Sequence, residues 1–268
     1  MNKTLVNTFK RSELANTLAF HDFSNSTYDL KGWVTYIVNL FRKYGLEPTM
    51  MGISAPTVKS TKMHAYKVEI KKLDTVDNAN ITGITILSTM DGELDYRYEI
   101  FTATFSVGLK SSINNCVITL DNALVPLQKK IWEDIVGKTA NFFKPRYGYG
   151  FQRLYKKGPG SYPSGICVLK YGDPEAKIIG CWSKAYRMPN GKYCTGDMRD
   201  IYPLNVLSSA HNQRMVEGMT LFDWINADTS RGSLTKLGED LWSWWLKDED
   251  SDSVRAALKP TGILLCAP

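Results

Sequence analysis

The chain has 268 residues, of which 43% are hydrophobic and 22% charged, and a formal net charge of +6 at pH 7. This composition is typical of a globular protein and excludes a chain that is disordered over most of its length. The sequence contains no run of about 18 apolar residues and no apolar segment near its start, so we expect a cytoplasmic protein without a membrane span.

The N-terminal half, residues 1–145, is predicted to fold as helix, four strands, helix. Residues 1–26 are polar and irregular, with a short helix expected over residues 12–18. The clearest helix covers residues 28–43 and begins at a cap formed by Ser26 or Thr27. Apolar residues recur at spacings of three and four along it, and we expect Trp33 to be a buried core residue.

After residue 64 the hydrophobic period changes to two, which predicts strands with one face in water. The strands are expected over residues 65–73, 81–87, 96–107 and 116–120. An amphipathic helix over residues 124–143 follows, and Pro145 ends it. Short connections between these strands predict an antiparallel sheet that two helices cover on one face.

The C-terminal half, residues 146–268, mixes short strands and helices. We expect strands over residues 149–155, 165–171 and 177–182, a helix over 203–210, a short helix over 221–227, a hairpin of 233–237 with 241–247, and a last helix over 250–258. The fold class is therefore α+β, with antiparallel sheets covered by helices. Two halves of similar size pack as one or two domains.

Basic charge is concentrated around the start of the second half. Residues 144–199 carry eleven basic and three acidic residues, a surplus larger than that of the whole chain, whereas residues 228–252 carry seven acidic and three basic residues. Such polarised charge attracts charged partners and steers their approach. A plain solvated surface is the alternative explanation.

The segment 146–166 is the densest mixture of basic, aromatic and glycine residues. We predict an exposed basic patch with tyrosines beside it as the binding site, formed by Arg146, Tyr149, Arg153, Tyr155, Lys156 and Lys157. Tyrosines between glycines followed by cations are suited to stacking bases and neutralising phosphates. The competing interpretation is a glycine-rich strand whose aromatic side chains point into the core while the glycines let two backbones pack closely.

Catalytic and metal-binding patterns are weak. Ser208 and His211 lie three residues apart on a predicted helix, but no nucleophile elbow precedes them. The five cysteines contain no C-x-x-C pair and the three histidines stand alone, whereas a zinc site normally shows a closely spaced ligand pair. We therefore expect reduced thiols, no metal, no cofactor and no catalytic residue. These expectations favour a non-catalytic protein over an enzyme.

The second half also carries motifs in a familiar order. RYGYGF at residues 146–151 is followed by DIYPLNVLS at 200–208 and by VRAALKP at 254–260. This order resembles the type VI secretion immunity-protein families of bacteria, in which a Gly-Tyr-Gly-type strand, an Asn-x-Leu segment and a closing Ala-Leu-x-Pro helix recur. The chain has Val206 where that family usually has tryptophan.

The resemblance implies a small α+β protein that blocks a toxin or effector by protein–protein contact, without catalysis of its own. A protein partner is therefore expected. The alternative is a nucleic-acid-binding or nucleic-acid-processing protein in phage or plasmid defence, which the basic segment with its interleaved tyrosines favours. A membrane partner is not expected.

Overall fold

The computed structural model describes residues 11–23, 28–55, 62–90, 99–107, 114–169, 172–186 and 192–265. The strands of the main sheet are β1 (Leu14–Phe23), β2 (Met50–Ser54), β3 (His64–Ala65), β4 (Gly83–Thr89), β5 (Glu99–Ser106), β6 (Asn115–Asp121), β7 (Pro145–Leu154), β8 (Leu204–Leu207), β11 (Ser233–Gly238) and β12 (Leu241–Trp245). The helices are α1 (Leu30–Lys43), α2 (Tyr66–Leu73), α3 (Lys129–Phe143), α4 (Pro174–Tyr186), α5 (Ser209–Asn212), α6 (Leu221–Asn226) and α7 (Ser251–Leu258).

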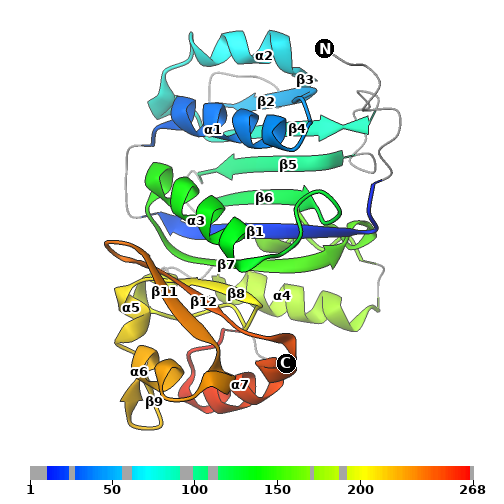
Figure 1. Cartoon of the computed structure of the whole chain (residues 1–268). Coiled ribbons are helices and arrows are strands. Elements are labelled where there is room, and N and C mark those ends of the chain that lie inside the picture. Colours follow the sequence, from blue (N-terminus) through cyan, green and yellow to red (C-terminus); the bar gives the residue numbers. More distant parts are fainter. Residues whose placement is uncertain are drawn as a thin grey trace.

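One antiparallel sheet runs through both halves of the chain. Its ten strands lie in the order β11-β12-β8-β7-β1-β6-β5-β4-β2-β3 (Figure 1). A separate ribbon is formed by β9 (Met215–Val216) and β10 (Met219–Thr220). The predicted α+β class with antiparallel strands is confirmed, and the pairing of β7 with β1 joins the second half to the first.

The two faces of the sheet carry two different cores. On one face, α1 and α3 pack against the strands, and this core includes Trp33, which has no exposed surface as predicted. Leu204, Val206 and Leu241 extend the same core into the second half. On the other face, aromatic side chains of β7 pack against the segments that follow it, up to α7.

The central strand β1 replaces the short helix expected over residues 12–18. β1 pairs with β6 along one edge and with β7 along the other. Its residues from Ala15 to His21 are buried, with Leu18 and Phe20 in one core and Ala19 in the other, so both of its faces are covered. A strand buried on both faces shows no polar alternation, which explains why the sequence pattern did not reveal it. Buried Asn16 donates from Nδ2 to the Val125 carbonyl at 2.8 Å.

Four other predicted elements are wrong. Residues 65–73 contain the helix α2, in which Glu69 and Leu73 are buried four residues apart while Val68 is 56% exposed. Residues 177–182 lie within the helix α4. The helix expected over 203–210 is instead β8 followed by the one-turn helix α5. Residues 165–169 of the strand expected over 165–171 form no strand, and residues 170–171 lie outside the described part.

The remaining predicted elements are confirmed with shifted ends. Asp29 caps α1 by accepting from the Gly32 amide at 2.8 Å, while the predicted caps Ser26 and Thr27 lie outside the described residues. The helix α3 begins at Lys129 rather than at 124 and ends at Phe143, just before Pro145. Strands β4, β5, β6, β7, β11 and β12 and helices α6 and α7 overlap their predicted ranges, but most begin or end a few residues away from the predicted bounds.

Candidate binding surface

The six predicted binding residues do not form one patch. Arg146 stands exposed at the start of β7, whereas Arg153 and the residues after it lie at the other end of the strand. Seven steps along a strand at about 3.3 Å each separate Arg146 from Arg153 by roughly 23 Å. The predicted single basic patch is therefore wrong.

Tyr149 is buried, which corrects the expectation that an exposed tyrosine flanks the patch. Its ring stacks on Tyr202 with the centroids 4.3 Å apart, and Tyr147 and Phe151 turn into the same core. Since β7 lies between β1 and β8, and later segments cover this face, no face of the strand remains for stacking bases at these three residues. The glycine-rich strand of the competing interpretation describes β7.

The glycines of β7 allow close packing on the opposite face of the sheet. A Cβ atom at Gly148 would lie 2.7 Å from the Ala19 carbonyl oxygen and 2.8 Å from the Phe20 ring. A Cβ atom at Gly150 would lie 3.0 Å from Leu204. Gly148 therefore requires glycine because the Ala19 backbone occupies the space, whereas a side chain at Gly150 would require Leu204 to shift.

Arg153 and Lys157 share one carboxylate instead of facing a partner. Arg153 is only 9% exposed, and its guanidinium pairs with Glu175 at the start of α4. The Lys157 ammonium lies 3.0 Å from the other oxygen of the same carboxylate. Desolvation opposes ionisation of Glu175, but the hydrogen bonds from these two cations outweigh it and lower the pKa of Glu175.

The last two predicted residues differ in their surroundings. The Tyr155 hydroxyl donates to the Ile100 carbonyl at 2.7 Å, and burial raises the pKa of Tyr155. Lys156 is exposed. Of the six predicted residues, only Arg146 and Lys156 are exposed, and they lie on separate parts of the surface.

A buried cation, Arg199, organises the aromatic core behind β7. It is 2% exposed and donates from Nη1 to the Tyr149 hydroxyl at 2.5 Å and to the Tyr162 carbonyl at 3.1 Å. Its guanidinium carbon lies 3.7 Å from the centre of the Trp182 ring and 3.9 Å from that of Tyr162. Sequence reasoning counted Arg199 only as one of the basic residues of its segment, because nothing in the local pattern marks it as buried.

Two histidines are also buried. His21 lies 5.5 Å, centroid to centroid, from Tyr149, and burial together with the nearby Arg199 charge lowers the pKa of His21 well below its ordinary value. His211, one of the residues considered for catalysis, accepts from the Ser208 amide at Nδ1 over 3.1 Å and so caps the short helix α5. Burial lowers the pKa of His211 to about 4.

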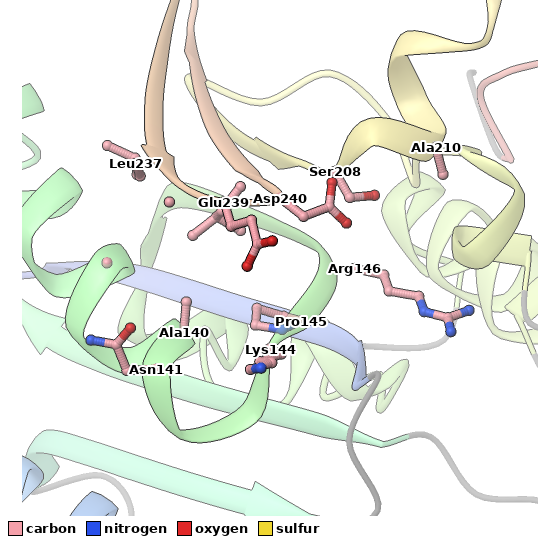
Figure 2. Close-up of a pocket in the computed structure, with 13 residues that line it drawn as sticks. Ala140, Asn141, Lys144, Pro145, Arg146, Ser208, Ala210, Leu237, Glu239 and Asp240 are labelled. Atoms are coloured by element: carbon pink, nitrogen blue, oxygen red, sulfur yellow. The ribbon is translucent and has the colours of Figure 1, made fainter.

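An open pocket of about 600 Å³ lies where α3, the start of β7, α5 and the β11–β12 turn meet (Figure 2). Its helical wall is formed by Gly137, Ala140 and Asn141 of α3. The buried residues Pro145 and Leu241 give it an apolar floor. The pocket therefore joins segments from both halves of the chain.

Charged side chains of both signs surround this pocket. Lys144 and Arg146 are exposed on the β7 side, and Glu239 and Asp240 are exposed on the hairpin side (Figure 2). Lys144 has a left-handed backbone with φ +46°, which most side chains avoid. Asp240 accepts from the Ser209 amide at 2.7 Å.

An apolar floor within a charged rim is the general anatomy of a protein interface. Of the charged residues that line this pocket, Arg146 is among the predicted binding residues, whereas Lys144, Glu239 and Asp240 are not. Lys144 is separated from Glu239 and Asp240 by more than ninety positions in the sequence, so only the folded chain brings them together.

The described residues contain no group of three or more His, Cys, Asp or Glu side chains arranged to hold a metal ion. None of the described helices is both long enough and apolar enough to cross a membrane.

Comparison with solved structures finds a similar fold. A Pseudomonas aeruginosa T6SS protein, PA0821, matches with a TM-score of 0.55 at 14% sequence identity, over 94% of this chain and 73% of that one. No protein-family model and no curated protein matches the sequence. The match therefore establishes that the two proteins share a fold over nearly the whole of this chain, which the sequence identity alone does not reveal.

Proposed function

We propose that this protein is a non-catalytic, immunity-type binding protein that neutralises a toxin or effector of a type VI secretion system by direct contact. The observation that carries the proposal is the fold similarity to a T6SS protein over 94% of the chain. The order of RYGYGF, DIYPLNVLS and VRAALKP resembles that in type VI secretion immunity-protein families and supports the same proposal.

The surface supports a role in binding a protein. The pocket beside α3 combines an apolar floor with a rim of exposed charges, and protein interfaces combine an apolar centre with a polar rim in the same way. Charges of both signs on that rim suit a protein partner, since complementary charges steer encounter and select the correct partner.

The test recovers the partner from the source organism with the full chain as bait. We expect one protein in amounts comparable to the bait, encoded next to this chain's gene. Expressed alone in a susceptible bacterial strain, this partner should stop growth, and co-expression of the chain should restore growth. Recovery of no protein partner, or of a partner that is harmless alone, would overturn the proposal.

A further inference from the structure

We propose that the pocket between α3 and the β11–β12 turn receives an extended segment of the partner protein that carries one acidic and one basic side chain. This inference rests on the proposed binding function and names the site and the chemistry of its occupant.

The first observation is a glycine inside α3. Gly137 lies in the interior of the helix, where glycine is less favourable than alanine because it loses more backbone freedom on folding. A Cβ atom at Gly137 would meet nothing within 4 Å, so packing within the chain does not require glycine there. Gly148 in β7 is the opposite case, because a Cβ atom there would collide with Ala19 and Phe20.

Gly137 lines the pocket. The absence of a side chain therefore leaves room outside the protein's own core, on the side from which an occupant enters. A glycine at such a position lets another backbone approach closely. This favours a chain segment over a bulky globular surface as the occupant.

The second observation is the distribution of charge around the pocket. Neither Arg146 nor Glu239 forms an ion pair or a side-chain hydrogen bond with another residue in the described ranges, and both are exposed. An arginine guanidinium binds carboxylates through two parallel hydrogen bonds. Arg146 therefore suits an acidic side chain of the occupant, and Glu239 suits a basic one.

The lining distinguishes a peptide segment from a small molecule. Small-molecule sites bury most of the ligand among apolar and aromatic side chains. This pocket is open, its described lining contains no aromatic side chain, and exposed charges form its rim, with Pro145 and Leu241 as its floor. These features fit a segment that remains attached to a larger partner.

The direct test is selection of short random peptides displayed on phage against the immobilised full chain. We expect the enriched peptides to contain an acidic and a basic residue. Peptides selected on the variant Arg146→Glu should lose the acidic preference, and those selected on Glu239→Arg should lose the basic one. Enrichment of nothing, or of peptides whose charges do not follow these exchanges, would overturn the inference.

The variant Gly137→Leu fills the pocket and has a matched control. Gly180 lies inside α4 and does not line the pocket, and a Cβ atom there would likewise meet nothing within 4 Å. We expect Gly137→Leu to weaken binding of a selected peptide by about tenfold or more, and Gly180→Leu to change it by less than about twofold. Equal affinity for both variants would reject the site.

Folding of both variants is checked by thermal unfolding, and leucine at an open helical position is expected to leave the melting temperature unchanged or raise it. Failure of this inference and failure of the proposed function give different results. A toxin that binds Gly137→Leu as tightly as the unaltered chain rejects the pocket and leaves the function standing. Charge-dependent peptide binding without any partner from the source organism supports the pocket and rejects the proposed function.

Discussion

The guanidinium carbon of Arg199 lies 3.7 Å from the centre of the Trp182 ring, with both side chains buried. Arg199 forms no ion pair with any carboxylate in the part of the chain that the structure describes. Its charge is instead stabilised by aromatic faces and by the oxygens of Tyr149 and Tyr162. Cation–π contacts are strongest where water is excluded. Arg199 therefore stabilises the aromatic core that packs against β7.

Replacing Arg199 is expected to destabilise the fold in a way that depends on volume. Arg199→Ala should cost about 3 kcal/mol, because it leaves a cavity between aromatic rings and removes two hydrogen bonds. Arg199→Met should cost less, because it fills most of the space and buries no charge. Urea unfolding measures both. Equal losses for the two variants would show that the charge, and not the volume, is what the core requires.

Charge reversal at the ion-paired Arg153 should destabilise the fold much more than charge reversal at the exposed Lys156. Arg153→Glu places a second carboxylate beside Glu175 in a nearly buried position and should cost about 3–5 kcal/mol. Lys156→Glu reverses a charge of the same sign on an exposed side chain and should change stability by less than about 0.5 kcal/mol. Similar unfolding midpoints for the two variants would contradict the structure.

Stability should fall between pH 6.5 and pH 4 because of His211. Burial lowers its pKa in the folded state to about 4 from 6.5, so the fold favours the neutral ring. The stabilisation is fully present above pH 6.5 and is lost as pH falls toward 4, by about 1.4 kcal/mol per pH unit where only the unfolded chain binds the proton.

His211→Asn keeps an acceptor for the Ser208 amide but cannot be protonated in this range. The variant should lose less stability than the unaltered chain over the same pH interval, and His21, whose pKa is lowered too, contributes equally to both proteins. Unfolding free energies at matched pH values provide the measurement. Parallel curves for the two proteins would assign the pH dependence to other groups.

Trp33→Ala should cost about 3–5 kcal/mol, the usual range for truncating a core aromatic residue. Trp33 is buried in α1 and lies 5.7 Å from Phe143 of α3 and 6.1 Å from Phe105 of β5, measured between ring centroids. Its removal therefore deletes packing contacts that join α1, α3 and β5. Thermal unfolding should show a lower midpoint, and an unchanged midpoint would mean that this core closes around the gap without loss.

The proposed binding site shows what a local sequence pattern cannot predict. The sequence marks segment 146–166 as unusual, and Arg146 does line the open pocket. Tyr149 and Arg153, from the same segment, are buried. The composition of a segment cannot show which face of a strand is covered, because that depends on β8 and on the loops that return over β7.

Elements with a clear period and an end signal were determined by the sequence alone. In α1, apolar residues at helical spacing fix the buried side. Its cap was predicted at Ser26 or Thr27, whereas Asp29 caps the helix in the structure. The hairpin of β11 and β12 follows from alternation over its two strands. Such elements depend on neighbours within a few positions, so local physical chemistry specifies them.

Tertiary structure decided the elements whose pattern depends on distant partners. β1 is a strand because β6 and β7 pair with it on both sides, although its sequence shows no alternation. Residues 204–207 become β8 because β7 and β12 supply hydrogen bonds to both edges. The charge of Arg199 is buried because rings from separate segments surround it, and the pocket exists because α3 and the β11–β12 turn meet. Free energy from contacts between segments far apart in the chain outweighs local propensity at these positions, and no short window of sequence contains those contacts.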